Sequence, residues 1–178
     1  MTRRIGIYPG TFDPVHDGHI AFCLEARKVC GLDTVYLLPE ANPRGKRDVT
    51  DQQERIRLLG EVVEKHSPLQ LVTVSSPQFT VAETLPELER EFAGDELTFL
   101  IGSDVARSLY LWTDLKSLLS KSSLIVGLRG LDTQQEVHRM IREAERAHGI
   151  FANYEIIVTK HPFVSSSQIR ALKASSTF

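Results

Sequence analysis

The stretch RIGIYPGTFDPVHDGHI, from Arg4 to Ile20, sets the pattern that decides the fold. Its apolar start, Arg4 to Tyr8, is typical of a short buried strand that ends at Pro9-Gly10. A helix is predicted soon after this loop, over residues 17–30, with Gly31 just beyond its C-terminal end. A strand, a loop and a helix in this order indicate a chain in which strands and helices alternate.

The alternation continues along the rest of the chain. Further strands are predicted at five apolar segments: Thr34–Pro39, Leu69–Val74, Leu97–Gly102, Leu124–Leu128 and Tyr154–Thr159. Helices are predicted after the capping-box patterns Thr50/Gln53 and Thr80/Glu83, over Asp104–Trp112 and Asp132–His148, and over Ser165–Lys173. Pro86 should kink or restart the helix that follows Thr80. We therefore predict an α/β fold: one domain over residues 1–178, with a doubly wound, Rossmann-like parallel sheet and helices on both faces.

Composition excludes several classes of protein. With 178 residues, 42% of them hydrophobic and 25% charged, the chain has the composition of a soluble globular protein. A net charge of −2 argues against a general nucleic-acid binder. The absence of an apolar run of about 20 residues, and of a signal peptide, predicts no membrane contact and a cytoplasmic location. Cys23 and Cys30 should lie about 10 Å apart along one helix, too far for a disulfide and unlike common zinc motifs.

The loops beyond the carboxyl ends of the strands hold most of the unusual polar residues. In doubly wound sheets this edge is where ligands bind. The residues expected there are Gly10, Thr11, Phe12, His16, Gly18, His19, Asn42, Arg44, Lys46, Gly102, Ser103, Asp104, Arg129, Ser165, Ser166, Ser167 and Arg170. The sequence contains no G-x-x-x-x-G-K, and no G-x-G-x-x-G follows the first strand, which argues against P-loop and dinucleotide-dependent hydride-transfer enzymes.

His16 and His19 stand at the first turn of the first predicted helix, where backbone N–H groups and the helix dipole attract anions. Their side chains should occupy neighbouring positions about 5–6 Å apart, which suits donors to two adjacent phosphates. Taken alone, each pattern is also typical of a structural role. Two histidines can be core or surface residues, a serine triplet is often only an N-cap, and Trp112 can be a core side chain. The spacing is a poor fit to zinc.

Two motifs together resemble the nucleotidyltransferase superfamily marked by H-x-G-H near the N-terminus. These are His16-Asp17-Gly18-His19 and, near the other end, Ser165-Ser166-Ser167-Gln168-Ile169-Arg170. Within that superfamily the chain most resembles bacterial nicotinate-nucleotide adenylyltransferases. The segments that carry this resemblance are GTFDPVHDGH, QFTVAETL (Gln78–Leu85), FLIGSD (Phe99–Asp104) followed by Trp112, and VSSSQIR, so the resemblance spans residues 5–172.

The resemblance implies a reaction and a set of roles. The reaction is transfer of AMP from ATP to nicotinate mononucleotide with release of pyrophosphate, by in-line attack without a covalent intermediate. His16, His19 and Arg170 would be catalytic, and Mg²⁺ would be carried by the ATP phosphates. The ATP-binding residues would be Gly10, Thr11, Phe12, Gly18, Gly102, Asp104, Arg129, Ser165, Ser166 and Ser167. The acceptor-binding residues would be Lys46, Thr80 and Trp112. The partners expected are these two substrates, with a homo-oligomer as an open possibility.

Two alternatives stay open at this point. The acceptor could be phosphopantetheine or nicotinamide mononucleotide. Tyr8-Pro9-Gly10 is more similar to pantetheine-phosphate adenylyltransferases, which favours the first of these. A non-catalytic regulator that binds nucleotides is the other alternative. The chain also departs from the family pattern in its second loop, where Pro43-Arg44-Gly45-Lys46 replaces the usual Pro-His-Lys, and at Phe79, where a tyrosine is common.

Overall fold

The sheet has six strands, all parallel, in the order β3-β2-β1-β4-β5-β6. This is a computed structural model that describes residues 1–43, 45, 48–159, 166 and 169. The strands are β1 Arg4–Gly10, β2 Thr34–Pro39, β3 Leu69–Leu71, β4 Glu96–Gly102, β5 Ser122–Gly127 and β6 Tyr154–Ile157. The chain runs outward from β1 to β3, then crosses back to β4 on the other side of β1. The order of the strands therefore reverses between β1 and β4, and the prediction of a doubly wound parallel sheet is confirmed.

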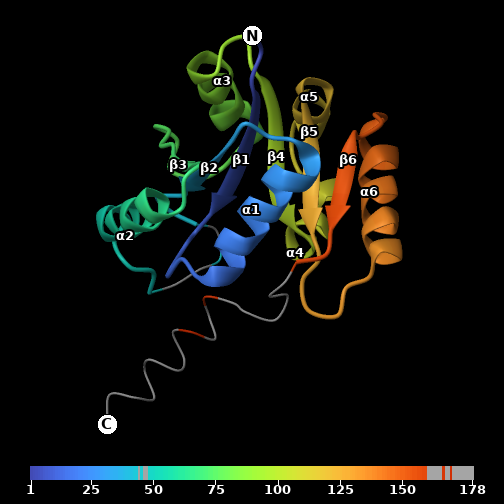
Figure 1. The fold of residues 1–178 in the computed structure, drawn as a ribbon. Helices are drawn as coiled ribbons and strands as arrows, with labels where there is room; N and C mark the ends of the chain where they lie inside the picture. Colours follow the sequence, from blue (N-terminus) through green and yellow to red (C-terminus); the bar gives the residue numbers. More distant parts are fainter. Residues whose placement is uncertain (44, 46–47, 160–165, 167–168, 170–178) are drawn as a thin grey trace.

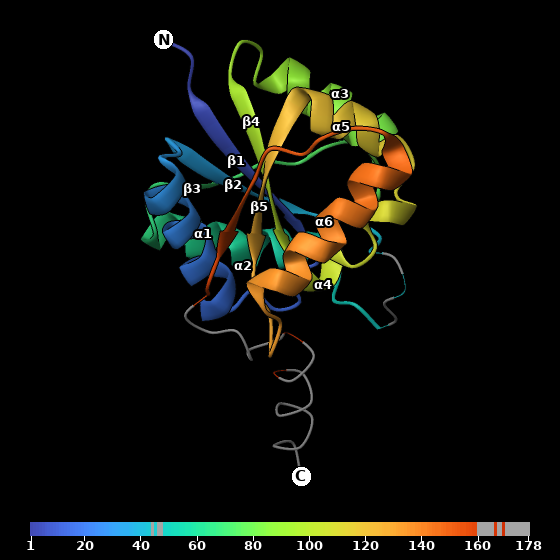
Figure 2. The same ribbon diagram turned by 90° about the vertical axis from the view of Figure 1, so that its right-hand side faces the viewer.

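Helices cover both faces of this sheet. They are α1 Asp17–Cys30, α2 Gln52–Lys65, α3 Val81–Glu91, α4 Ser103–Ala106, α5 Leu115–Lys121 and α6 Gln134–His148, with a 3₁₀ helix η1 at Leu109–Leu111. Figures 1 and 2 together show α1 and α2 against one face and α3, α5 and α6 against the other. The two views also place the ends of β1 and β4 side by side at the lower edge of the sheet in Figure 1.

The apolar residues of the strands divide between two cores because successive side chains point to opposite faces. In β4, Phe99 packs in the core under α3, α5 and α6, whereas Leu100 packs in the core under α1 and α2. In β1 the same division separates Ile7 from Tyr8. Tyr8 is thereby directed toward α1, and this orientation matters for the site described below.

The structure corrects the start of α2, the capping box of α3 and the end of β3. The N-cap of α2 is Asp51 rather than Thr50, since the Asp51 carboxylate accepts the Gln53 N–H at 2.9 Å while the Thr50 N–H is directed to Asp13. Thr80 caps α3 as predicted, but the capping box is incomplete, because the Glu83 side chain does not accept the Thr80 N–H. The Thr80 N–H donates to the Thr84 hydroxyl instead of to Glu83. Strand β3 ends at Leu71, three residues earlier than predicted.

Three further helical features differ from the prediction. Helix α3 is continuous through Pro86, which is exposed, so water can reach the Ala82 carbonyl that loses its helical partner. The helix predicted over 104–112 is split into α4 and η1. The Ser108 hydroxyl and N–H both bond the Val105 carbonyl, which favours a turn there. Helix α5 was not predicted. Among the described residues, none of the helices is long and apolar enough to cross a bilayer.

Candidate active site

A cleft of about 810 Å³ opens at the carboxyl ends of β1 and β4, where the strand order reverses. Its lining comes from segments that are far apart in sequence. The lining residues that carry polar or aromatic groups include Tyr8, Thr11, Phe12, His19, Glu40, Phe79, Thr80, Glu83, Asp104, Ser108, Trp112, Asp114, Arg129 and Ser166. Part of the predicted set of site residues thus lines one cavity: Gly10, Thr11, Phe12, His19, Thr80, Gly102, Asp104, Trp112, Arg129 and Ser166.

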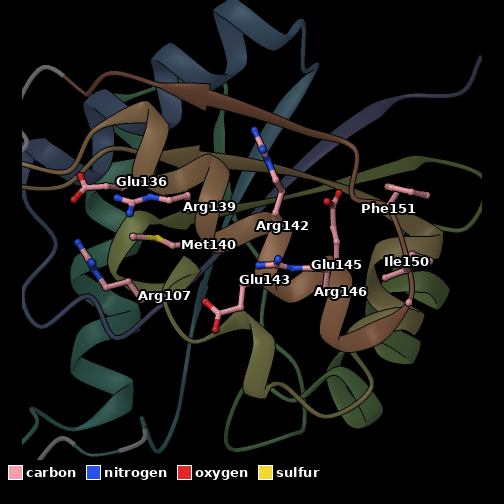
Figure 3. A pocket seen from close by; sticks show the side chains of 11 residues that line it. Arg107, Glu136, Arg139, Met140, Arg142, Glu143, Glu145, Arg146, Ile150 and Phe151 are labelled. Carbon is pink, nitrogen blue, oxygen red and sulfur yellow. The ribbon is translucent and has the colours of Figure 1, made fainter.

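A larger hollow of about 1160 Å³ lies along α6 (Figure 3). Its side chains carry charges of both signs, with Arg139, Arg142 and Arg146 close to Glu136 and Glu143 on the same helix. Size alone would favour this hollow as the site. We place the site in the smaller cleft because it lies at the switch point and is lined by His19 of the H-x-G-H motif. Mixed charges along a helix are typical of a solvated face.

His16 and His19 form one compact unit at the start of α1. His16 is the N-cap residue, and its backbone N–H donates to His19 Nδ1 at 3.2 Å. In the neutral form His19 therefore carries its proton on Nε2, which leaves that nitrogen as a donor. The two rings are stacked with centroids 3.7 Å apart. Both residues are buried, and His19 lines the cleft.

Phe12 has a left-handed backbone, with φ at 50°, which is uncommon for a bulky residue. Its ring is buried and makes edge contacts with the rings of Tyr8 and His19, at centroid distances of 5.5 Å and 5.1 Å. A side chain at Gly10 would collide with this ring, because a Cβ there would lie 2.9 Å from it. The strained turn thus places the Gly10, Thr11 and Phe12 backbone along the cleft wall, beside His19.

Arg55 of α2 is a buried cation that sequence reasoning missed. Only 1% of the residue is exposed, and its guanidinium donates to the carbonyls of Thr11 (2.7 Å), Glu40 (2.9 Å), Ala41 (3.1 Å) and Thr50 (2.8 Å). Burial lowers the pKa of Arg55 from its ordinary value, yet a guanidinium stays charged at neutral pH. Arg55 therefore fixes the loop after β1 to the loop after β2.

Arg129 follows β5 and extends over the cleft toward β1 and β4. Its Nη2 donates to the Tyr8 hydroxyl oxygen at 2.9 Å, and its Nε lies 4.0 Å from Asp104 Oδ1. Gly102 makes room for this arrangement. A Cβ there would lie 2.1 Å from the Asp104 carboxylate and 3.1 Å from Arg129 Nε. The last residue of β4 must consequently be glycine for these charged groups to lie side by side.

The other end of the cleft is built around the start of α3. Thr80 caps this helix by accepting the Glu83 N–H on its hydroxyl at 3.2 Å. The ring of Phe79 lies 5.7 Å from that of Trp112, centroid to centroid, and the Phe79 N–H donates to Glu40 Oε1 at 3.0 Å. This end therefore offers two aromatic rings, carboxylates and the first turn of a helix.

A hydrogen bond joins Ser166 of the C-terminal motif to the loop that precedes the H-x-G-H motif. The Ser166 hydroxyl donates to the Pro14 carbonyl at 2.9 Å, across 152 positions of sequence, and Ser166 lines the cleft. His16 and Gly18 are buried in or next to the first turn of α1, behind the described surface of the cleft. Five of the residues predicted at this edge of the sheet lie outside the described residues: Arg44, Lys46, Ser165, Ser167 and Arg170.

This fold is a Rossmann-like α/β domain with a cleft at the point where the strand order reverses. The chain belongs to the cytidylyltransferase-like family, whose model matches residues 7–172. The resemblance to the nucleotidyltransferase superfamily is thus confirmed over nearly the whole chain.

The named relatives are nicotinate-nucleotide adenylyltransferases. A probable enzyme of this name from Clostridium perfringens is 34% identical over 130 residues, which cover 70% of this chain and 64% of that protein. One from Desulfitobacterium hafniense is 30% identical over 98% of this chain and 81% of its own length. The matched part thus spans just under two thirds of the Clostridium perfringens relative.

A solved structure shares the fold. It is the Plasmodium falciparum nicotinic acid mononucleotide adenylyltransferase complexed with NaAD, with a TM-score of 0.76 at 18% identity over 95% of this chain and 83% of that one.

Proposed function

We propose that this protein transfers AMP from ATP to nicotinate mononucleotide and releases pyrophosphate. The phosphate oxygen of the mononucleotide attacks the α-phosphorus of ATP, and the bond from that phosphorus to the oxygen bridging to the β-phosphate breaks. The nucleophile is already anionic and pyrophosphate is a stable leaving group, so positioning and charge neutralisation supply most of the rate. The observation that carries the proposal is the meeting of the histidine motif and Ser166 in one cleft.

The phosphate end of the cleft supports triphosphate binding. His19 Nε2–H and the Arg129 guanidinium line it, and both can donate to phosphate oxygens. The N-terminus of α1 adds the positive end of a helix dipole. His16 stacks on His19 and holds its ring in place. These groups would stabilise the negative charge that moves onto the departing pyrophosphate.

Mg²⁺ enters in this proposal as part of the substrate MgATP. Phosphate and carboxylate oxygens are the ligands that Mg²⁺ prefers, and the Asp104 carboxylate lines the cleft with 70% of its side chain exposed. Within the described ranges no group of three or more His, Cys, Asp or Glu side chains could hold a metal ion. We therefore assign to the Asp104 carboxylate a contact with the Mg²⁺ that the triphosphate carries.

The acceptor end supports a nicotinate ring. The ring of nicotinate mononucleotide is a pyridinium cation, which suits the face of Trp112 and the carboxylates of Glu40 and Glu83. Its carboxylate suits the first-turn N–H groups of α3, since Val81 and Ala82 both line the cleft behind the Thr80 cap. A phosphopantetheine chain has neither a cationic ring nor a carboxylate, so it cannot make the cation–aromatic and ionic contacts that these groups offer.

The test is pyrophosphate release from MgATP with each of three acceptors: nicotinate mononucleotide, nicotinamide mononucleotide and phosphopantetheine. We expect the highest kcat/KM with nicotinate mononucleotide. Release with phosphopantetheine alone would replace the proposed acceptor. Binding of ATP without release from any acceptor would favour a regulatory protein over an enzyme.

A further inference from the structure

Arg129 is held at its guanidinium end by Tyr8. The Tyr8 hydroxyl oxygen accepts the Arg129 Nη2–H at 2.9 Å. Tyr8 is 4% exposed, and its ring makes edge contacts with Phe12 and Phe22 at centroid distances of 5.5 Å and 5.4 Å. The phenol oxygen is therefore a fixed acceptor at the floor of the cleft, and it restricts where the guanidinium can lie.

The backbone of Arg129 is held by a second, separate contact. Its N–H donates to the Ser103 hydroxyl oxygen at 2.9 Å, and that hydroxyl in turn donates to Asp132 Oδ2 at 2.6 Å. Ser103 is completely buried, and Asp132 is further held by an ion pair with Arg107, which lines the hollow along α6 (Figure 3). This contact fixes the point at which the Arg129 side chain leaves the loop after β5.

The chemistry of the Tyr8 contact leaves the positive charge of Arg129 intact. Burial raises the pKa of Tyr8 above its ordinary value, so the phenol stays protonated and neutral at physiological pH. A neutral acceptor orients a guanidinium without neutralising it, unlike a buried carboxylate at the same place. The nearest described carboxylate, Asp104, is 4.0 Å away and largely exposed, so water screens that pair.

We propose that Tyr8 and Ser103 are positioning residues that hold Arg129 ready for the triphosphate of ATP, an inference that rests on the proposed function. A guanidinium on a free loop loses rotational freedom when it binds phosphate. One that is fixed beforehand at both ends loses less and keeps its fork aimed at the ligand. Loss of either contact should therefore weaken ATP binding through Arg129, with no change in how the acceptor ring is bound.

The test is calorimetric titration of MgATP into the protein without any acceptor. We expect Tyr8→Phe and Ser103→Ala each to raise the Kd for MgATP about three- to tenfold. Arg129→Ala should raise the Kd at least as much, and adding Tyr8→Phe or Ser103→Ala to Arg129→Ala should raise it no further. Tyr154→Phe is the matched control, because it removes a phenol oxygen that bonds His138 at 2.6 Å and does not line the cleft.

The outcomes separate the inference from the proposed function. If Tyr8→Phe and Ser103→Ala bind MgATP as the unchanged protein does, the positioning roles are wrong even though ATP binding stands. If they weaken binding equally with and without Arg129, they act on the fold in general, and the inference is again wrong. If the unchanged protein does not bind MgATP at all, the proposed function itself fails.

Discussion

The two ends of the cleft are built on different principles. At the phosphate end, His19 is 8% exposed and Arg129 is fixed by the Tyr8 oxygen and the Ser103 hydroxyl. At the acceptor end, Phe79 and Trp112 are only partly buried and present ring faces beside a helix start. A rigid end suits the reacting phosphorus, where small displacements cost rate, and an aromatic end suits selection among rings. Arg55 joins the two ends, because it binds the Thr11 carbonyl in the loop after β1 and the Glu40 carbonyl in the loop after β2.

Arg55→Met should have the largest effect, because it damages both ends at once. The change leaves four carbonyls without their donor, and each buried carbonyl without a donor is expensive. We expect a loss of about 3 kcal/mol or more in the free energy of unfolding, measured by urea denaturation. Arg57→Met is the control on the same helix, where exposed ion pairs with Glu54 and Glu61 predict a change within about 0.5 kcal/mol. Equal stability of the two variants would contradict the bridging role.

His19→Ala breaks the phosphate end alone. Removal of the Nε2–H donor should lower kcat by at least about 100-fold, since it removes stabilisation of charge that develops in the transition state. The KM for the acceptor should change little. His148→Ala, which alters a histidine of α6 that bonds the Tyr110 carbonyl and does not line the cleft, should leave kcat unchanged. Near-normal turnover of His19→Ala with a native melting temperature would remove this histidine from the mechanism.

Trp112→Ala breaks the acceptor end alone. We expect the KM for nicotinate mononucleotide to rise about tenfold while the KM for ATP stays the same, as loss of a stacking face predicts. Tyr110→Ala removes a neighbouring, more exposed ring of η1 that does not line the described cleft, and it serves as the control. An increase in the KM for ATP instead would mean that the two ends have been assigned the wrong way round.

Thr80→Ala should have the smallest effect. It tests whether the start of α3 contributes to acceptor binding as well as to stability. Loss of an N-cap hydroxyl costs about 1 kcal/mol of stability. Thr133→Ala removes the equivalent hydroxyl from the cap of α6, where Thr133 accepts the Glu136 N–H at 3.3 Å. Both variants should lose similar stability in thermal melts, and only Thr80→Ala should raise the KM for the acceptor. A similar rise for Thr133→Ala would show that the effect comes from stability alone.

Local patterns predicted the framework because the forces that set it are local. The apolar run Leu97–Gly102 predicted a strand, whose successive side chains Phe99 and Leu100 pack on opposite faces of the sheet, and Gly31 ended its helix as a left-handed C-cap. Helix α5 escaped prediction because it has only seven residues and starts at Asp114 without a side-chain cap.

The contacts that complete the site join residues that no local pattern relates. The Arg129–Tyr8 bond spans 121 positions and the Ser166–Pro14 bond spans 152. Arg55 could have been found from sequence, since it stands four residues before Leu59 on the stripe that α2 buries. A charged residue on an apolar stripe needs hydrogen-bond partners when it is buried. The carbonyls that accept from Arg55 come from other segments of the chain, so only the folded structure identifies them.

The most direct test of the central claim is one reaction that contains ATP labelled at the α-phosphate and equal amounts of the three acceptors. The ratio of labelled products then gives the ratio of kcat/KM values under identical conditions. The account predicts that the label appears chiefly in the adenylylated nicotinate mononucleotide, with one pyrophosphate released for each product formed. Label found chiefly in adenylylated phosphopantetheine would contradict it.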